Sequence, residues 1–321
     1  MGAATAKAVH VRVNSQLLVL IGILAFICLV FTFTTESFLT TENLGNLVRS
    51  SAFVIVTGAG VTLLMISGNI DLSVGSVLAL ASCVYAFAAK TGMPVVLAAL
   101  LGALSGLAVG VINALTAVRW KVTPFIATLG TMYAVRGFVL IISDAKTVRG
   151  GLPTSFTFLD MAHLGPIPLA FFIVLVVVLI FYAIEKKALL GKYSFAIGGN
   201  KTAAVLSGIN ADAVLIKLYL IVGLLAGLSG VMMGSRIAVG DPNVGVGFEF
   251  DVIIAVILGG TSLAGGKGSI IGMIVGALIV QVIGNGLNML NVLSFWQSVI
   301  KGFLLVLAVV LNQALVRTKG R

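Results

Sequence analysis

Charge is the scarcest property of this sequence. Only 9% of the residues are Asp, Glu, Lys or Arg, whereas 60% are hydrophobic. Soluble domains have about 25% charged residues. A chain with so few charges cannot cover itself with a water-soluble surface, so the composition excludes an ordinary soluble protein and predicts a chain embedded in a lipid bilayer.

Histidine and cysteine are almost absent, which excludes several kinds of catalytic and metal site. The histidines are His10 and His163, and both lie in polar segments outside the apolar runs. The serine of the GLSG motif at Gly227–Gly230 therefore lacks the base that a serine nucleophile needs, and no helix has a histidine pair for zinc. Cys28 and Cys83 lie inside apolar runs and indicate neither a disulfide nor a metal site. The sequence predicts no enzyme activity, no metal and no cofactor.

The basic residues give the chain a net charge of +10, but they form neither a basic patch nor a basic helix. They lie between apolar runs, a distribution that is typical of membrane topology and argues against nucleic-acid binding. Glycine is common, with 38 residues. Small residues let transmembrane helices approach each other closely, so the glycine content also fits a helical membrane protein in contact with lipid.

Ten apolar runs are candidates for membrane spans, which need about 20 apolar residues each. The first follows a weakly basic N-terminus and ends in TFTTESFL, a poor cleavage site, so it is predicted to be a retained helix. The third and eighth runs are short, and we expect broken or re-entrant helices there. We predict an all-α polytopic membrane protein of about ten helices. The predicted spans are 16–34, 50–67, 72–89, 94–118, 123–142, 166–184, 214–236, 250–265, 269–290 and 294–313.

An even number of spans places both termini on the same side of the membrane. With that side inside, thirteen Lys and Arg residues lie in inner segments and six in outer segments, as the positive-inside rule requires. We therefore predict cytoplasmic tails at 1–15 and 314–321 around a transmembrane domain at 16–313. The inner segment at 185–217 is too long for a tight turn. It is either an amphipathic loop or a pair of short surface helices that docks a cytoplasmic partner.

One acidic residue, Asp71, interrupts the apolar sequence in the stretch SGNIDLSVGS, Ser67–Ser76. An ionised carboxylate at membrane depth costs about 2.5–3.5 kcal/mol on insertion scales. One interpretation is structural: Gly68 ends a helix in a left-handed conformation, and Asp71 or Ser73 caps the start of the next helix. The other is functional: Asn69, Asp71 and Ser73 belong to a broken helix that lines the translocation pathway.

A few other polar side chains lie inside the predicted spans. Arg136 either reaches toward an interface or faces a cavity, where it pairs with a carboxylate or with helix-end carbonyls. Asn113, Thr131 and Asn285 are of the kind that hydrogen-bonds between helices, and together they would also offer a neutral polyol a pathway with weak hydrogen bonds. The spans contain neither an acid cluster typical of a proton relay nor a ring of charges typical of an ion channel.

The glycine-rich stretch GGTSLAGGKGS, at Gly259–Ser269, resembles a phosphate-binding loop only at first sight. A P-loop requires Gly, four residues, then Gly-Lys and Ser or Thr. Here the residue five before Gly266 is Thr261, and Lys267 is followed by glycine. The motif fails at both ends. We interpret Gly265, Gly266 and Lys267 as an inner turn between the eighth and ninth spans, with a flexible hinge or a partner contact as the alternative.

Four stretches in this order resemble one known family, the membrane permease subunits of bacterial ABC-type monosaccharide importers of the ribose, xylose and galactose permease class. They are SGNIDLSVGS, RWKVTPFIATLGTMYAVRGF (Arg119–Phe138), GGNKTAAVLSGIN (Gly198–Asn210) and EFDVIIAVILGGTSLAGGKGS (Glu249–Ser269). The resemblance extends from about residue 15 to 313. Four matches in the family's order are specific, whereas any one of them alone would be weak.

The resemblance implies a multi-pass protein of the bacterial inner membrane with both termini in the cytoplasm. It also implies three partners: a tandem ATP-binding subunit that holds the ATPase, a periplasmic sugar-binding protein, and a second permease copy. By similarity to the family's coupling segment, the residues expected to contact the ATPase are Gly199, Ala203, Ala204 and Gly208.

A different class of transporter is the main alternative. An ion- or proton-coupled secondary carrier for a small neutral solute would need membrane carboxylates arranged as a relay, and Asp71 alone gives little support for one. Members of the resembled family differ in their sugar, and no motif in this sequence identifies which sugar it is.

Overall fold

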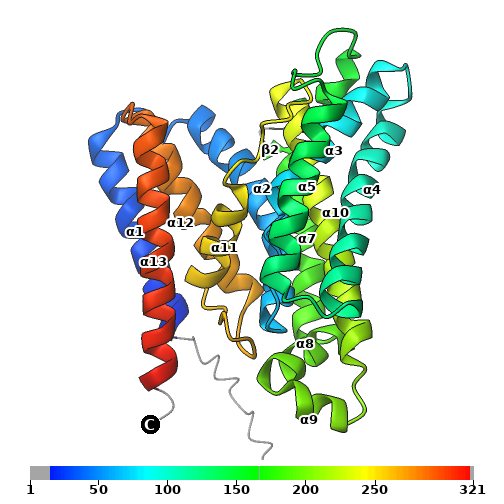
Figure 1. Ribbon diagram of the computed structural model, residues 1–321. Coiled ribbons are helices and arrows are strands. Elements are labelled where there is room, and N and C mark those ends of the chain that lie inside the picture. Colours follow the sequence, from blue (N-terminus) through cyan, green and yellow to red (C-terminus); the bar gives the residue numbers. More distant parts are fainter. Residues whose placement is uncertain (1–14, 166, 319–321) are drawn as a thin grey trace, which may run out of the picture.

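Most residues of the chain lie in helices, as the sequence predicts (Figure 1). The computed structural model describes residues 15–165 and 167–318. Within that part the only strands form a small antiparallel hairpin, in which Leu164 pairs with Ile167. The α-helices are α1 (Ser15–Thr34), α2 (Thr41–Ile66), α3 (Val74–Lys90), α4 (Val95–Ala114), α5 (Pro124–Ile142), α6 (Phe158–Met161), α7 (Leu169–Lys186), α8 (Leu189–Gly199), α9 (Lys201–Leu206), α10 (Ala211–Ile237), α11 (Phe248–Leu258), α12 (Ile270–Met289) and α13 (Ser294–Thr318). The short elements are the π-helical turn η1 (Leu115–Arg119), the 3₁₀ turn η2 (Thr154–Thr157), and the strands β1 (His163–Leu164) and β2 (Ile167–Pro168).

Each of the ten predicted spans coincides with one helix. Seven helices are long and apolar enough to cross a membrane, namely α1, α2, α4, α5, α7, α10 and α12. Two further apolar stretches, Val74–Lys90 and Ser294–Val310, are shorter. α11 has only 11 residues, about 16 Å at 1.5 Å per residue, so it cannot cross the core alone. α13 continues to Thr318, beyond the predicted end of the last span, and residues 1–14 and 319–321 lie outside the described part.

The helices run between two ends of the molecule that are named here by the elements lying there. The α8 end carries α8, α9 and the turn between α11 and α12, at the bottom of Figure 1. The hairpin end carries β1, β2 and the long connection between α5 and α7, at the top. The helices form two groups, with α1, α11, α12 and α13 on one side and α3, α4, α5, α7 and α10 on the other.

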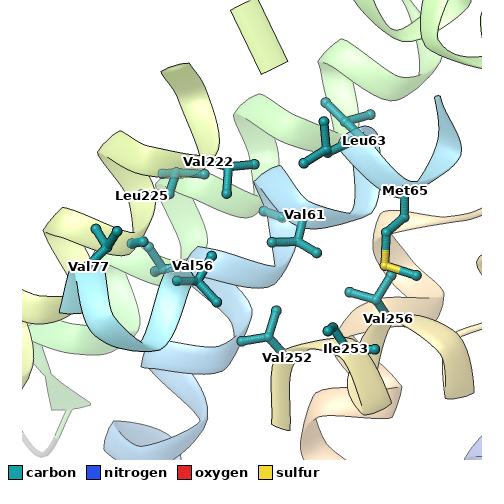
Figure 2. Packing of buried hydrophobic residues seen from close by; sticks show 14 of the residues in the cluster. Val56, Val61, Leu63, Met65, Val77, Val222, Leu225, Val252, Ile253 and Val256 are labelled. Atoms are coloured by element: carbon teal, nitrogen blue, oxygen red, sulfur yellow. The ribbon is translucent and has the colours of Figure 1, made fainter. Parts of the chain in front are cut away.

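α2 lies between the two groups. All sixteen residues from Ser51 to Ile66 are buried, which is expected of a helix that is apolar on every face. Val56 and Val61 lie with Val222 of α10, and Met65 lies by Val256 of α11 (Figure 2). α2 therefore joins the core of one group to that of the other.

Glycine allows α4 and α10 to pack backbone against backbone. A Cβ added at Gly106 would overlap the Gly223 carbonyl oxygen, and one added at Gly227 would lie 2.5 Å from the Ala103 oxygen. Gly110 would meet the Tyr219 oxygen at 2.6 Å. These glycines recur at intervals of four residues, the spacing typical of close helix pairs in membranes.

α3 and α11 begin inside the molecule rather than at one of its ends. A Cβ on Gly75, in the first turn of α3, would overlap Oε2 of Glu249 in the first turn of α11, and also the Gly245 oxygen. α3 is reached from the α8 end through residues 67–73, and α11 from the hairpin end through residues 238–247. Two short helices therefore start next to each other within the bundle. Irregular backbone at membrane depth requires such cover by protein.

Candidate functional site

Asp71 lies in a closed network of hydrogen bonds at the start of α3. Its side chain is buried, and Oδ1 accepts from the Ser73 backbone nitrogen at 2.8 Å and from Ser73 Oγ at 2.7 Å. Asn113 of α4 donates from Nδ2 to Asp71 Oδ2 at 3.0 Å and to Ser73 Oγ at 2.8 Å. These bonds replace the water that a buried carboxylate loses. Asp71, Ser73 and Asn113, predicted separately, are thus brought together.

The backbone before Asp71 has the geometry of a glycine helix cap. Gly68 has φ +81°, and the Asn69 nitrogen donates to the Leu64 oxygen at 3.1 Å. This pattern ends a helix by reversing its direction. Ser73 precedes α3 as N-cap residue but makes no side-chain cap bond of its own. The Asp71 carboxylate accepts from the nitrogen of Ser73 itself, so it satisfies the N–H that directly precedes α3 and not one inside its first turn. This arrangement is in keeping with the structural interpretation of Asp71.

Asn69 lies away from this network, in a cavity of about 590 Å³ at the α8 end, which we call the α8-end cavity. Its Nδ2 donates to the Ser67 oxygen at 3.2 Å. The cavity is bounded by the 67–69 backbone, by η1 with the loop that follows it, and by the junction of α8 and α9. Gly199, one of the predicted ATPase contacts, also lines it. The cavity therefore connects the α8–α9 segment with the helix break.

Residues 188–208 fold into the short helices α8 and α9. Asn200 caps α9 by accepting from the Ala203 nitrogen at 2.9 Å. Of the four predicted contact residues, Gly199, Ala203 and Gly208 are exposed and Ala204 is buried. Leu206 has 84% of its surface exposed and Val205 has 51%, and Lys201 and Thr202 of the same helix are exposed as well. The exposed side of α9 therefore offers apolar side chains beside polar ones.

The predicted inner turn packs directly on the end of α2. The Gly266 nitrogen donates to the Ile66 oxygen at 2.8 Å. Gly265 and Gly266 have φ +84° and +74°, so both adopt the left-handed conformation that glycine allows. Lys267 is exposed. A Cβ on Gly198 of α8 would overlap the Ile66 oxygen and lie 2.5 Å from the Gly266 nitrogen. The turn and α8 thus meet at the point where α2 ends.

Arg136 faces into the bundle and not toward an interface. Its Nη1 donates to the Pro242 oxygen at 2.7 Å and to the Val244 oxygen at 2.8 Å. Both carbonyls belong to residues 238–247, the connection that leads to α11. Of the two interpretations of Arg136, the structure shows the pairing with backbone carbonyls. Arg136 therefore holds the connection to α11 in place.

The two remaining predicted residues lie elsewhere. Thr131 of α5 lies in a groove of about 690 Å³ between α3, α4 and α5, where almost all the lining side chains are apolar, and its Oγ1 donates to the Ala127 oxygen at 3.0 Å. We call it the apolar groove. Asn285 of α12 forms a reciprocal amide pair with Asn43 of α2, with bonds of 3.1 and 2.8 Å. Asp71, Ser73 and Asn113 therefore form one cluster, whereas Asn69, Thr131, Arg136 and Asn285 lie at other places. Asn285 lines a polar cavity that also contains Asp251 and Lys301.

A model of one protein family covers this arrangement of helices. It matches residues 43–309, from α2 to α13, and is described as "Branched-chain amino acid transport system / permease component". The chain belongs to this permease family. As a transport component, the permease is not an enzyme, which agrees with the sequence prediction.

The permease is also similar to curated proteins over nearly its whole length. It is 38% identical to the ribose import permease protein RbsC of Bacillus subtilis over 90% of each chain. It is 39% identical to the D-allose transport system permease protein AlsC of Escherichia coli over 91% of this chain and 90% of the relative. It is 34% identical to the L-arabinose ABC transporter permease protein AraH of Azospirillum brasilense over 94% and 88%. No solved structure gives a significant match.

Three buried or partly buried charged residues of the permease were not among the site residues that the sequence predicted. Arg236, Glu249 and Asp251 lie in or beside apolar runs, and the structure places them near the middle of the molecule or toward the hairpin end. The sequence does mark two of them, because Glu249 and Asp251 are acidic residues in the first turn of an otherwise apolar helix. The proximity of Asp251 to Arg236 is not readable from the sequence, because α10 and α11 approach each other only after folding.

Proposed function

We propose that the chain is the membrane permease of an ATP-driven ABC importer that carries a monosaccharide into a bacterial cell. The observation that supports this most directly is the similarity to three permeases whose names specify ribose, D-allose and L-arabinose, each over about nine tenths of both chains. The sugar itself stays unassigned, because relatives with different sugars are nearly equally similar.

A secondary carrier is the weaker candidate. Such a carrier needs membrane carboxylates that can exchange protons or ions along a path. Asp71 has both oxygens in hydrogen bonds within its network, and Asp251 Oδ2 is paired with Lys301 at 2.8 Å. These two buried acids are therefore held in place by fixed partners and lie apart from each other, not in a relay. The family description also names branched-chain amino acids, which makes an amino acid the natural competing substrate.

The orientation follows from the positive-inside rule, with the α8 end in the cytoplasm and the hairpin end outside. The tandem ATP-binding subunit docks on the exposed side of α9 and the sugar-binding protein on the hairpin end. A second copy of the permease completes the membrane part. Both termini lie in the cytoplasm.

Coupling to ATP has a short physical path in this arrangement. Force on α9 reaches α8, whose Gly198 touches the backbone of Ile66 and Gly266. Those residues begin the break before α3 and belong to the turn before α12. A small displacement at α9 therefore reaches two helices that are already interrupted, and interrupted helices need less energy to tilt than continuous ones. The permease then alternates between states open to opposite sides.

Reconstituted transport tests the proposal. The permease is placed in proteoliposomes with its ATP-binding subunit and binding protein, and uptake of labelled D-ribose, D-allose, L-arabinose and L-leucine is measured with and without ATP. We expect ATP-dependent uptake of at least one of the sugars and none of leucine. ATP-dependent uptake of leucine alone would support the competing substrate. Uptake without ATP, driven by an ion gradient, would contradict the importer assignment.

A substitution on α9 tests the docking surface separately. Leu206→Asp places a charge on the exposed side of α9 without removing a buried contact, since Leu206 is 84% exposed. We expect uptake to fall at least about tenfold while membrane abundance stays normal, because a charge that meets an apolar contact is left without a partner. Lys201→Asp, also exposed and five residues away, is the comparison for a change of charge alone. Normal uptake by Leu206→Asp would place the docking surface elsewhere.

A further inference from the structure

A polar cavity of about 340 Å³ lies toward the hairpin end, between the two helix groups. Its walls come from α2, α10, α11, α12 and α13, and nine of its eleven lining residues have polar or charged side chains. An adjoining cavity of about 290 Å³ shares Ser50, Arg236, Asp251 and Gln281 with it. We call the two together the hairpin-end cavity. So polar an interior surface is expensive in a membrane protein and points to a function.

Two charged groups at this cavity keep an atom free for a ligand. Nη1 of Arg236 and Oδ1 of Asp251 are buried, and neither has a hydrogen-bond partner within residues 15–165 and 167–318. The other oxygen of Asp251 pairs with Lys301 Nζ at 2.8 Å. The Arg236 guanidinium lies 5.7 Å from the centre of the Phe53 ring. A buried donor and a buried acceptor left unpaired each cost about 1–3 kcal/mol, so an occupant that satisfies both is favoured.

The chemistry of these walls selects the kind of occupant. A hydroxyl group both donates and accepts, so neighbouring hydroxyls of a sugar can donate to the Asp251 carboxylate and accept from the Arg236 guanidinium. An anion would meet Arg236 but would be repelled by Asp251. An apolar molecule would leave both groups unsatisfied. The volume lies at the lower end of the range of about 300–1,000 Å³ for small-molecule sites, which suits a ligand of the size of a monosaccharide.

The apolar groove is a useful comparison, because it is a cavity of the same molecule in which no polar ligand is expected. At about 690 Å³ it is larger than either part of the hairpin-end cavity. Its side chains are almost all apolar, and its few hydroxyls donate within their own helices, as Ser105 Oγ does to the Gly102 oxygen at 2.7 Å. Size alone therefore does not distinguish the two, whereas free polar atoms do.

We propose that Arg236, Asp251 and Gln281 form a binding site for the hydroxyl groups of a monosaccharide, on the route from the hairpin end into the permease. This site rests on the proposed sugar-import function and specifies where the sugar is held. Asp251 accepts hydrogen bonds from hydroxyl groups, Arg236 donates to hydroxyl oxygens, and the Gln281 amide does both. Lys301 holds Asp251 in position through its ion pair.

The first test compares uptake by variants of the full permease, reconstituted with its partner subunits. Gln281→Leu keeps the size of the side chain and removes its amide, and Asp251→Asn removes the charge. For the sugar taken up best among D-ribose, D-allose and L-arabinose, we expect kcat/KM of uptake to fall about tenfold or more in Asp251→Asn, which loses a hydrogen bond to a charged group, and about threefold or more in Gln281→Leu, which loses a neutral one. Ser105→Ala, in the apolar groove, is the matched control and stays within about twofold of wild type.

The second test detects binding without transport. Cys28 and Cys83 are replaced by alanine, the background is checked for normal uptake, and Gln281→Cys or Ser105→Cys is added. A membrane-impermeant thiol reagent is applied in the absence of ATP, with and without saturating sugar. We expect reagent to label Gln281→Cys, the transported sugar to slow that labelling at least threefold, and Ser105→Cys to show no protection.

The outcomes separate the two proposals. Normal uptake by Gln281→Leu and Asp251→Asn, or labelling of Gln281→Cys that no sugar slows, would overturn the binding site while wild-type sugar uptake left the proposed function intact. Failure of the wild type to take up any of the three sugars would overturn the proposed function and, with it, the sugar assigned to this site.

Discussion

The two helix breaks at the α8 end begin alike and then differ in how the next helix is capped. The first break, residues 67–73, has Gly68 at φ +81°, and the second break, residues 259–269, has Gly260 at φ +91°. Each follows with the same hydrogen bond, from Asn69 to the Leu64 oxygen and from Thr261 to the Val256 oxygen, both 3.1 Å. The two breaks therefore share one way of ending a helix.

The carboxylates that stabilise the following helices have different origins. In the first break Asp71 accepts from the Ser73 nitrogen, two residues away. In the second break the acceptor for the Ile270 nitrogen is Glu185 Oε2 of α7, at 2.8 Å. The first cap is local and moves with its own helix. The bond from Ile270 to Glu185 joins two helices, so a movement of α7 relative to α12 removes it, whereas Ser269 keeps its local bond from the Gly272 nitrogen at 3.3 Å. A rearrangement of helices can therefore weaken the second break more readily than the first.

The largest loss of stability and uptake is expected from a substitution that disrupts the contact between the two breaks. Gly198→Ala places a methyl group on the Ile66 oxygen and the Gly266 nitrogen, and breaks the 2.8 Å bond that joins the breaks. Because backbone atoms have to move, we expect a loss of about 1–3 kcal/mol in stability and uptake below about one tenth of wild type. Gly199→Ala, where an added Cβ meets nothing within 4 Å, is the neighbouring control for stability alone, because Gly199 is also a predicted ATPase contact. Equal thermal unfolding of the two variants would contradict a contact role for Gly198.

The second largest effect is expected from replacing the Asp71 carboxylate. Asp71→Asn keeps the shape but places an amide group beside the donors Ser73 and Asn113, so at least one charge-assisted hydrogen bond, worth about 1.5–3 kcal/mol, is lost. Asn113→Ala removes only donors and leaves the Ser73 bonds to Asp71, so we expect a smaller effect. Membrane abundance together with uptake measures both. Near-normal values for the two variants would exclude a special role for Asp71.

The hydrogen bond from the Ile270 nitrogen to Glu185 should tolerate a conservative substitution of Glu185. Glu185→Gln keeps an oxygen that can accept from the Ile270 nitrogen, whereas Glu185→Ala leaves that buried N–H without a partner. We expect thermal unfolding to report a loss of about 1–2 kcal/mol for the alanine variant and clearly less for glutamine. If the two variants are equally destabilised, the negative charge of Glu185 matters more than its hydrogen bond.

Strain at the first glycine should have the smallest effect. Gly68→Ala forces alanine into the left-handed region, which costs about 1–2 kcal/mol, but an added Cβ would be 3.8 Å from its nearest atom and would meet no obstacle. Gly92→Ala, at φ +84° and with open space around it, carries the same strain far from the breaks. We expect equal losses of stability and unchanged uptake in both. Lower uptake in Gly68→Ala alone would show that the break changes conformation during transport.

The sequence predicts local features of this molecule well. Ten apolar runs correspond to ten helices, and the short eighth run corresponds to the 11-residue α11. The cap at Gly68 and Asp71 was also accessible, because its partners are near neighbours in the chain. Such features depend on hydrophobic periodicity and on hydrogen bonds within a few residues, and both can be read directly.

Contacts between distant helices could not be predicted in the same way. The pairing of Glu185 with Ile270 spans 85 residues, and that of Lys301 with Asp251 spans 50. Thr131 and Asn285 were grouped because both are polar residues in spans, yet one lies in the apolar groove and the other beside Asn43. Composition identifies which residues are polar, whereas only the rotation of each helix about its axis determines what they face.

The glycine contact between α4 and α10 limits how the permease can move. Where backbones touch, no side chain can change rotamer to accommodate sliding or rotation, because an atom added at Gly106 already overlaps the opposite carbonyl. We therefore expect α4 and α10 to move together. Alternation of access is then expected at contacts made by side chains, such as those around the hairpin-end cavity. The glycine-rich contact between α4 and α10 is in this sense a stiff one.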